Sequence, residues 1–422
     1  MKLVSTRTPS LEATFLEAVQ AGLAPDGGLY IPTELPRFAD AAELLKVDFQ
    51  TRSAEVLHRL IGAEIPRADL DALVRRTFTF GAPVVPVVGN ISALELFHGP
   101  TLAFKDFGAR FLAQVMAYAT TGHRRTVLTA TSGDTGAAVA QAFWGLPGVQ
   151  VVVLYPKGRV SPLQERQFAT CGGNVLALAV EGAFDDCQRL VKAAFEDAEL
   201  VSTLGLTSAN SINIARLLAQ TLYYFEAAAQ LPGDAPLVAS VPSGNFGNLY
   251  AGLLAQRCGA PISRFVVATN ANRVVPEYLE TGTYLPRPSV ATLSNAMDVG
   301  APSTWERIHS LFHGDHNAMA SDLRWGSCTD AETSATVLEL DQKGYLADPH
   351  GAVACHVLRR HLRAGEQGLF LATAHPAKFS EALVPTLGRE IPLPKALSEL
   401  LDLPLLCEPL AADQAALKRR LL

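Results

Sequence analysis

The chain has 422 residues, of which 49% are hydrophobic and 18% are charged, and its formal net charge is −6. This length and composition predict a folded protein of two or three structural units, and they exclude a disordered chain or one small domain. The acidic balance offers no basic surface for a nucleic acid or an anionic membrane, so we expect a small-molecule substrate and no nucleic-acid partner.

The six cysteines lie far apart and form no CxxC pair. They match neither a disulfide framework nor a zinc-finger spacing, so we expect reduced and mostly buried thiols. The first fifteen residues lack the apolar core of a secretory signal, and no later run approaches the roughly 18 apolar residues of a membrane span. A cytoplasmic location without a membrane partner is therefore expected.

Residues 1–90 predict a separate N-terminal unit. Amphipathic helical patterns cover residues 41–47 and 54–62, and a turn-rich segment, APDGGLYIP, covers residues 24–32. Residues 80–89, with two prolines and several valines, predict an extended connection rather than a helix. We place a domain boundary at about residue 90.

From about residue 126 the pattern changes to short apolar strands that alternate with helices. The predicted strands cover residues 126–130, 149–155, 174–180, 237–241, 264–269 and 369–373. The predicted helices begin at about Ala137 and after residue 180, and cover residues 212–230 and 249–259. This alternation is typical of parallel α/β sheets. Two of the strand–helix units open on similar turns, TSGDTG and PSGNFG.

Lys105 is the first residue that could carry chemistry. It lies between Phe104 and Phe107 where an apolar helical pattern begins. Burial disfavours an ammonium group and leaves a nucleophilic amine, as Schiff-base formation with an aldehyde cofactor requires. Taken alone, a lysine near a helix start is more often a solvated surface charge.

The two glycine-rich turns are candidate anion sites, because each joins a strand to a helix whose first N–H groups are free. In residues 243–248 the glycines permit close backbone approach and the serine and asparagines add donors, which suits a phosphate monoester. In residues 131–136 the hydroxyls suit a carboxylate. A capped helix after a tight turn explains either one alone. Neither turn matches a dinucleotide or P-loop fingerprint.

A histidine cluster and an aromatic helix favour structural interpretations. His309 and His313 have the i,i+4 spacing of a metal pair, and His316 follows. The pattern lacks HExxH and Gly314 interrupts it, so we expect a structural or surface role and no metal. The residues around Tyr223, Tyr224 and Phe225 predict core packing.

Six motifs taken together resemble the threonine synthase family in its longer form. They are HGPTLAFKDFGARF, TATSGDTGAAVA, SANSINIARLL, VPSGNFGNL, LSNAMDV and TAHPAKF, which occur in this order from residue 98 to residue 379. The APDGGLYIP segment extends the resemblance into the N-terminal unit. The resemblance implies a fold-type-II pyridoxal-phosphate enzyme in which an accessory domain (1–90) precedes a catalytic domain (91–422). The smaller α/β lobe would cover roughly residues 110–205, and the larger lobe the remainder.

The resemblance also implies roles for individual residues. Lys105 would carry pyridoxal 5'-phosphate as a Schiff base and move protons, and Thr373 would lie at the pyridine nitrogen. The cofactor-phosphate loop would comprise Ser243, Gly244, Asn245, Phe246, Gly247 and Asn248. The turn for the substrate α-carboxylate would comprise Thr131, Ser132, Gly133 and Thr135.

Asp134 departs from the commoner pattern, since many fold-type-II relatives have asparagine there. The resemblance places Asp134 at the phenolic oxygen of the cofactor. A carboxylate accepts a hydrogen bond and a protonated acid donates one, and the sequence leaves both states open. The distal phosphate of the substrate would meet Asn210, Ser211 and Arg216. For Arg216, a position on the exposed helix surface is the alternative interpretation.

The activity that the resemblance implies is conversion of O-phospho-L-homoserine and water into L-threonine and phosphate. One alternative is a phospho-lyase that uses the same residues but releases 2-oxobutyrate, ammonia and phosphate. The other is a non-catalytic or nucleotide-binding α/β protein. The expected assembly is a monomer or a homodimer.

Overall fold

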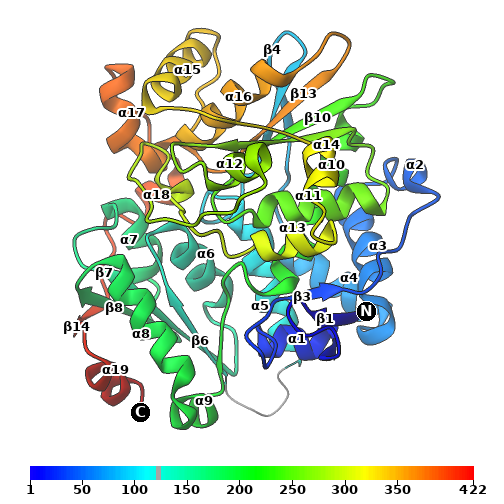
Figure 1. The fold of residues 1–422 in the computed structure, drawn as a ribbon. Helices are drawn as coiled ribbons and strands as arrows, with labels where there is room; N and C mark the ends of the chain where they lie inside the picture. Colours follow the sequence, from blue (N-terminus) through cyan, green and yellow to red (C-terminus); the bar gives the residue numbers. More distant parts are fainter. Residues whose placement is uncertain (120–124) are drawn as a thin grey trace.

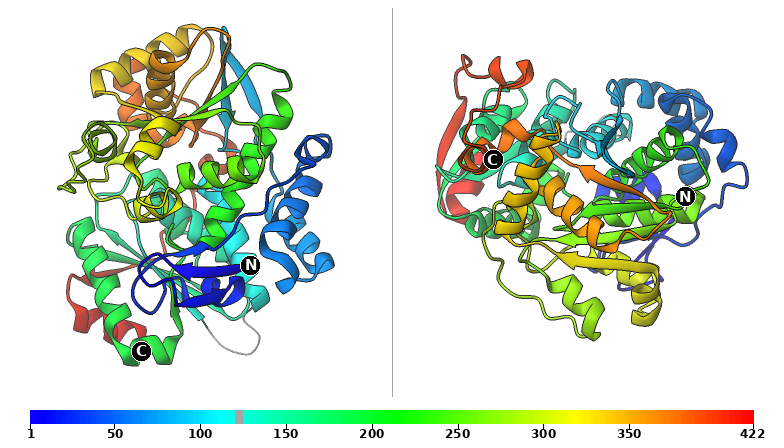
Figure 2. Two further views of the ribbon diagram at one scale, coloured as in Figure 1. Left: turned by 45° about the vertical axis from the view of Figure 1, so that its right-hand side comes forward. Right: turned by 90° about the horizontal axis from the view of Figure 1, so that it is seen from above.

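The computed structural model describes residues 1–119 and 125–422. Figure 1 and the left view of Figure 2 show two α/β lobes, one above the other, with the N-terminal residues beside the level at which the lobes meet. The expected fold class is confirmed: each lobe contains a predominantly parallel sheet covered by helices, as a parallel sheet buried on both faces requires.

The smaller lobe contains a five-stranded parallel sheet. Its order is β14 (Cys407–Ala411), β8 (Val175–Glu181), β7 (Val149–Pro156), β6 (Arg125–Ala130) and β9 (Leu206–Thr207). The strands predicted at residues 126–130, 149–155 and 174–180 are therefore confirmed. Strand β14 and helix α19 (Gln414–Leu421) return from the C-terminal end of the chain to complete this lobe, which the pattern of residues 407–411 did not indicate.

Helix α6 (Asp134–Phe143) begins three residues before the predicted start at Ala137. The cause is the hydroxyl of Thr131, whose Oγ1 accepts from Gly133 N at 3.0 Å and from Gly136 N at 2.8 Å. These bonds satisfy free N–H groups at the helix start and stabilise its first turn. The early start places Asp134 in that first turn.

The larger lobe contains a six-stranded sheet. Its order is β12 (Leu323–Ser327), β11 (Arg264–Thr269), β10 (Leu237–Pro242), β13 (Gln367–Ala372), β5 (Ile91–Glu95) and β4 (Val84–Val88). The strands predicted at residues 237–241, 264–269 and 369–373 are confirmed. The extended segment predicted at residues 80–89 contains β4, the antiparallel edge strand, where Pro86 is tolerated because an edge strand need not donate on both sides.

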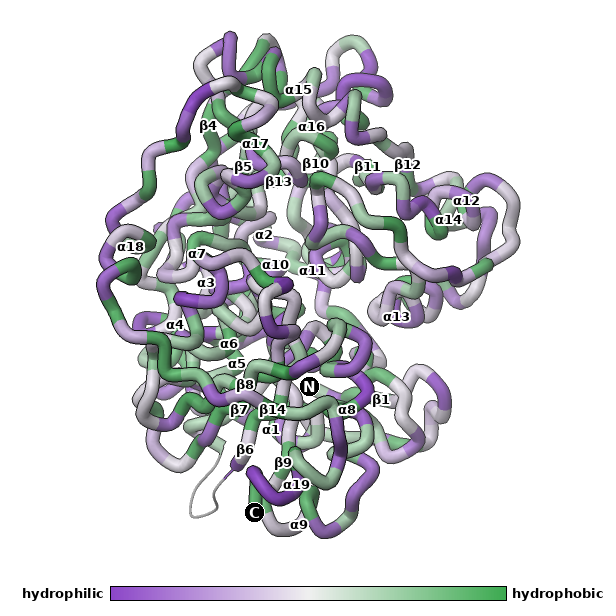
Figure 3. The backbone as a smooth tube through the Cα atoms, turned by 90° about the vertical axis from the view of Figure 1, so that its left-hand side faces the viewer, coloured by the Kyte–Doolittle hydropathy of each residue, from purple (hydrophilic) through white to green (hydrophobic). Residues whose placement is uncertain are grey.

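Long helices cover this sheet and pack between the lobes. Among them are α5 (Lys105–Ala119), α10 (Ile214–Gln230), α11 (Gly247–Cys258), α15 (Asp330–Gln342) and α16 (Pro349–His361). Tyr223, Tyr224 and Phe225 of α10 are fully buried, which confirms the predicted core packing. In Figure 3 hydrophobic stretches concentrate on inner segments such as β10 and β13. All six residues of β10 are buried.

The N-terminal residues form a small antiparallel sheet followed by helices. Strands β1 (Lys2–Ser5), β2 (Glu12–Thr14) and β3 (Tyr30–Pro32) make the sheet, and α1 (Phe15–Ala21) follows β2 directly. Helix α3 (Phe49–Ile61) contains nearly all of the pattern at residues 54–62, whereas α2 (Ala41–Leu44) covers only the first half of residues 41–47. The three short strands were not predicted.

The cysteines and histidines follow the structural interpretation. All six cysteines are free and five are buried. Helix α13 (Trp305–Leu311) ends before His313, whose φ is +54°, so His309 and His313 do not share a helix face. The ring of His316 contacts the carbonyl oxygens of Tyr278 and Leu279. Within residues 1–119 and 125–422, no helix combines the length and hydrophobicity that a membrane crossing needs.

Candidate active site

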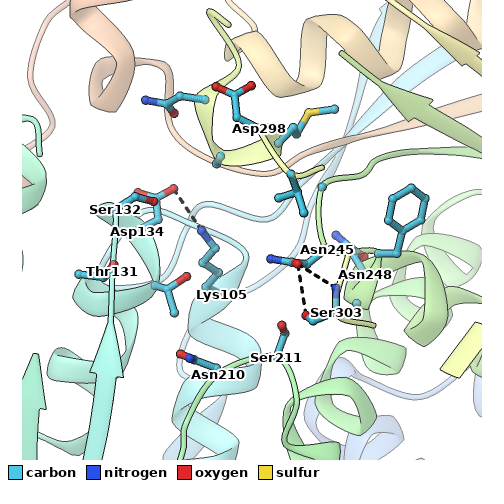
Figure 4. Close-up of a pocket in the computed structure, with 18 of the residues that line it drawn as sticks. Lys105, Thr131, Ser132, Asp134, Asn210, Ser211, Asn245, Asn248, Asp298 and Ser303 are labelled. Carbon is cyan, nitrogen blue, oxygen red and sulfur yellow. Dashed lines mark hydrogen bonds and ion pairs between the residues drawn. The ribbon is translucent and has the colours of Figure 1, made fainter. Parts of the chain in front are cut away.

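A cavity of about 600 Å³ is lined by residues from both lobes, including the carboxyl ends of the sheets and the turns that follow them. Ligands of open α/β sheets bind at this edge. Most of the predicted site residues line the cavity: Lys105, Thr131, Ser132, Asp134, Thr135, Asn210, Ser211, Arg216, Gly244, Asn245, Phe246, Gly247, Asn248 and Thr373. Figure 4 shows ten of the cavity residues labelled, with Lys105 between the loops that carry the others.

Lys105 and Thr373 are neighbours although 268 positions separate them. The segment before Lys105 pairs with the segment after β13 through a bridge between Ala103 and Ala374. Phe104 N donates to the Thr373 carbonyl at 2.8 Å, and His375 N donates to the Leu102 carbonyl at 3.0 Å. These bonds fix the first turn of α5 against the carboxyl end of β13. They bring Lys105 to the base of the cavity.

The Lys105 amine has the electrostatics of a nucleophile. Its side chain is only 16% exposed, and Nζ lies 3.8 Å from Asp134 Oδ2, as the dashed line in Figure 4 marks. Burial lowers the pKa of Lys105 to about 8, with further lowering from the charges of Lys378 and Arg216 that the Asp134 charge opposes. Roughly a tenth of the amine is therefore uncharged at pH 7, far more than for a lysine with the ordinary pKa.

The loop between β10 and α11 contains two backbone features that suit an anion. A Cβ on Gly244 would lie 2.9 Å from Met297 Cα, so only glycine fits there. Phe246 has a φ of +63°, a left-handed conformation that is costly for a phenylalanine and typical of functional loops. Helix α11 begins immediately afterwards, so its first N–H groups lie at the cavity.

Two asparagines of this loop are held by their carbonyl oxygens. The hydroxyls of Tyr223 and Tyr224 donate to Asn248 Oδ1 at 2.7 and 2.6 Å. This leaves Asn248 Nδ2 buried and without a partner in the described structure. The backbone N and Oγ of Ser303 donate to Asn245 Oδ1 at 3.3 and 3.2 Å, and the amide nitrogen of Asn245 lies on the side toward Lys105 in Figure 4. Both amides therefore have NH₂ groups available to a phosphate.

Two predicted residues do not line the cavity. Ser243 is buried, and its Oγ donates to the Val241 carbonyl at 2.9 Å. Gly133, at φ +142°, gives its N–H to Thr131 Oγ1. The Ser243 hydroxyl and the Gly133 amide are thus used within their own turns. This leaves Ser132 and Thr135 as the hydroxyls of the first turn without an intramolecular role of this kind.

Arg216 is buried and faces the cavity from the first turn of α10. This position contradicts the alternative of an exposed helix arginine, since the residue is 3% exposed. One guanidinium nitrogen donates to the Ala209 carbonyl at 2.9 Å, and Nε has no partner in the described structure. Asn210 is held by Thr129, whose hydroxyl donates to Asn210 Oδ1 at 2.8 Å. A buried cation with free donors suits a phosphate.

Sequence reasoning missed several residues of the cavity. Asn295 to Gly300 form a loop that lines it, and Ala296 N donates to His350 Nε2 at 3.3 Å. The other ring nitrogen of His350 lies 2.8 Å from Asp348 Oδ1. Arg287 also lines the cavity and pairs with Glu277. The motif LSNAMDV marks the loop in the sequence, but no signal marks Arg287 or His350.

Asp134 has two partners that the sequence did not pair with it. Lys378 Nζ lies 2.7 Å from Asp134 Oδ1, and Gln164 Nε2 donates to the same oxygen at 2.9 Å. Burial alone would raise the pKa of Asp134, but Lys378 and Lys105 together hold it well below its usual range. Of the two states that the sequence left open, the structure favours the carboxylate, which accepts hydrogen bonds.

Arg307 connects the substrate side of the cavity to the N-terminal residues. It is fully buried, and its guanidinium donates to the carbonyl oxygens of Tyr30, Ser211 and Ile212 at 3.0, 3.2 and 2.6 Å. Asn213 Nδ2 also donates to the Val19 carbonyl at 2.9 Å. The loop that carries Asn210 and Ser211 is therefore held in place by the N-terminal sheet and helix.

We expect Arg307→Met to lower the thermal unfolding midpoint and to raise the KM for the substrate. The substitution removes the guanidinium from three carbonyl oxygens, one of them in a fully buried hydrogen bond, a loss of about 3 kcal/mol or more. Thermal unfolding and steady-state kinetics measure the two effects. Arg257→Met is the matched control, because Arg257 is exposed and donates to a single carbonyl. Equal midpoints for the two variants would contradict the role given to Arg307.

The described residues fit pyridoxal phosphate. The cavity offers an amine of lowered pKa, the free NH₂ groups of the buried Asn248 and the exposed Asn245, and a helix start beside a glycine at which no Cβ fits. An aldehyde that also bears a phosphate monoester needs these groups. Thr373 is buried at the same cavity and carries a neutral hydroxyl.

Comparisons with known proteins find similarity to one kind of enzyme over the whole chain. The family model described as pyridoxal-phosphate dependent enzyme matches residues 89–373. Models for the threonine synthase N terminus and C-terminal region match residues 2–78 and 351–420. The threonine synthase of Haemophilus influenzae is 52% identical over 424 residues, covering 100% of both chains.

Solved structures give the same result. The crystal structure of threonine synthase from Escherichia coli has a TM-score of 0.94 at 52% identity and covers 100% of this chain and 99% of that one. The pyridoxal-phosphate-bound threonine synthase from Brucella melitensis has a TM-score of 0.96 at 39% identity, with coverages of 100% and 98%. The chain therefore belongs to the threonine synthase family of pyridoxal-phosphate-dependent enzymes.

Proposed function

We propose that the protein converts O-phospho-L-homoserine and water into L-threonine and phosphate, with Lys105 as the residue that binds the cofactor covalently. The observation that carries this proposal is the position of the Lys105 amine in one cavity with two separate sets of anion-binding groups. One set is the loop at residues 243–248, and the other is Arg216 with its neighbours. A phosphorylated cofactor and a phosphorylated substrate together need two such sets.

The loop between β10 and α11 would hold the cofactor phosphate. Its donors are the amides of Asn245 and Asn248 and the first N–H groups of α11. The tyrosine hydroxyls on Asn248 Oδ1 keep that amide oriented before any ligand binds. Thr373 would contact the pyridine nitrogen. When bound, the cofactor supplies a conjugated electron sink next to the substrate Cα.

The substrate would be held at both of its ends. Ser132 and Thr135 offer hydroxyls to the α-carboxylate, beside the start of α6. Asn210, Ser211 and Arg216 would hold the distal phosphate and favour its departure from Cγ. Lys378 and Gln164 both contact Oδ1 of Asp134 and keep the group ionised. The carboxylate can therefore act only as a hydrogen-bond acceptor toward the cofactor. Substrate orientation thus depends on groups from both lobes.

Lys105 is the group placed to move protons in the reaction. Its amine, with a pKa of about 8, can take a proton from Cα and then from Cβ, and can return one to Cγ after phosphate has left and one to Cα. Water adds a hydroxyl group to Cβ, and its remaining proton goes to the released phosphate. A single base can serve successive positions because the lysine side chain is long and flexible, and among the described residues Asp134 is its one ionic partner within 4 Å.

Product analysis tests the proposal. The purified protein with bound cofactor, given O-phospho-L-homoserine, should release threonine and phosphate in equal amounts. The rival phospho-lyase would release 2-oxobutyrate, ammonia and phosphate instead. Phosphate release without threonine would contradict the proposal. No turnover by a protein that retains its cofactor would also contradict it.

The remaining features of the proposal rest on the sequence. We infer an accessory domain at residues 1–90 and a catalytic domain at residues 91–422, with a smaller lobe over roughly 110–205. Composition and charge support a cytoplasmic protein that binds no nucleic acid. A monomer or a homodimer is the proposed assembly, and light scattering of the purified chain measures it.

Thr373→Asp should change how the products are partitioned. A carboxylate at the pyridine nitrogen would raise the pKa of that nitrogen and strengthen electron withdrawal by the ring. Loss of phosphate from Cγ should then slow, and keto-acid side products should increase relative to threonine. Chromatography of the products measures this ratio, with Thr373→Ser as the control that keeps the hydroxyl. An unchanged ratio in a folded, cofactor-bound Thr373→Asp protein would show that Thr373 does not contact the ring nitrogen.

A further inference from the structure

Lys378 is a buried lysine that the proposed reaction does not use. It lies in the short 3₁₀ turn Pro376–Phe379, and its side chain is 0% exposed. Its Nζ donates to the Thr101 carbonyl at 2.7 Å and lies 2.7 Å from Asp134 Oδ1. A fully buried ammonium is rare unless it is paired. The Asp134 carboxylate is its partner.

Asp134 stands between two lysines and is closer to one of them. Its Oδ1 lies 2.7 Å from Lys378 Nζ, whereas its Oδ2 lies 3.8 Å from Lys105 Nζ. Gln164 Nε2, at 2.9 Å from Oδ1, reinforces the first contact. The carboxylate is therefore bound to Lys378 at hydrogen-bond distance, and Lys105 is left outside that distance.

The charged groups around Lys105 set the pKa of its amine. Three such groups face it: Asp134 of α6, Lys378 of the 3₁₀ turn and Arg216 of α10. Lys378 in turn faces Asp106 of α5 and His375. Asp134 is the only one of these groups that opposes deprotonation of Lys105; the other two charges facing it favour the free amine.

We propose that Lys378 is a positioning residue for Lys105: its ammonium holds the Asp134 carboxylate and so leaves the Lys105 amine free to react with the aldehyde of the cofactor. This inference rests on the proposed role of Lys105. Without Lys378, the buried carboxylate would have Lys105 as its nearest cation and would pair with it at close range. The amine would then be held as an ammonium, which is not a nucleophile.

The test is a double-mutant cycle on the full-length chain after removal of its cofactor. The free amine of Lys105 is acylated with a small amine-reactive reagent, and the extent of acylation is measured by mass spectrometry as a function of pH. Lys378→Met should raise the apparent pKa of Lys105 from about 8 by about one unit and slow acylation at pH 7 about tenfold. In Lys378→Met/Asp134→Asn the carboxylate is gone, and the rate should return to within about threefold of wild type.

A purely structural role for Lys378 predicts a different pattern. It would leave the Lys105 pH profile unchanged in Lys378→Met, or make the double variant as slow as the single one, and either result would overturn the proposal. Lys395→Met is the control, since Lys395 is 86% exposed and does not line the cavity. If Lys378→Met does not fold, Asp134→Asn alone should lower the Lys105 pKa, and a rise would refute the idea.

Acylation needs neither cofactor nor substrate. It therefore succeeds or fails independently of the product analysis that tests the reaction. Adding pyridoxal phosphate back to the cofactor-free protein gives a second measurement with the same variants. Lys378→Met should attach the added pyridoxal phosphate about tenfold more slowly than wild type at pH 7, and the double variant should recover. A reattachment rate that is normal in Lys378→Met would contradict the proposed positioning role.

Discussion

Replacing Lys105 by alanine should remove the absorbance of the covalently bound cofactor and nearly all turnover. Among the described residues no other lysine lines the cavity, and the nearby Lys378 Nζ is committed to Asp134 and to the Thr101 carbonyl. Loss of the group that moves protons costs at least 10²–10⁴-fold in rate, and loss of the covalent attachment adds to this. An absorption spectrum and a threonine assay measure the two effects.

The matched control is Lys157→Ala. Lys157 is 58% exposed, pairs with Glu181 and does not line the cavity, so this variant should keep the spectrum and the rate of wild type. The Lys105→Ala protein should still bind pyridoxal phosphate noncovalently, because the loop at residues 243–248 is intact. Normal threonine production by Lys105→Ala would refute the assignment of Lys105.

The parts of the fold that were predictable are those whose residues are buried along most of their length. Strands β6, β7, β10 and β13 are mainly apolar and mainly buried, since both faces of a parallel sheet are covered. Strands β12 and β14 were missed because their sequences, LRWGS and CEPLA, contain polar residues, Gly326 or Pro409, and lie at sheet edges. Their stability comes from pairing with a neighbour that is distant in sequence.

In the site, too, features that depend on one short motif were predictable, and features that depend on contacts between distant segments were not. The presence of Lys105 and of the two glycine-rich turns at the cavity was predictable because each belongs to one short motif. The pairing of Asp134 with Lys378 was not, because it joins α6 to a turn some 240 positions later. The motif TAHPAKF contained Lys378, yet nothing local distinguishes a buried lysine from an exposed one. The long-range pairing of residues 102–104 with residues 373–375 brings that turn to the cavity.

Arg216→Ala should weaken binding of O-phospho-L-homoserine far more than binding of pyridoxal phosphate. Arg216 is buried, one of its nitrogens is held by Ala209, and its Nε is unpaired among the described residues. A charge-assisted hydrogen bond of this kind contributes about 1.5–3 kcal/mol, which corresponds to roughly ten- to a hundredfold in affinity. The cofactor phosphate is assigned to a different loop, so cofactor affinity should change by less than about threefold.

A second arginine of the cavity provides the comparison variant for this prediction. Arg287 lines the same cavity but is 44% exposed and already paired with Glu277. Its charge is therefore screened by water and by its partner, and Arg287→Ala should weaken substrate binding by much less than Arg216→Ala. Titration of each variant with substrate and with cofactor separates the possibilities. If Arg287→Ala weakens substrate binding more than Arg216→Ala does, the substrate phosphate binds at Arg287 rather than at Arg216. Equal losses of substrate and cofactor affinity in Arg216→Ala would mean that one site holds both phosphates.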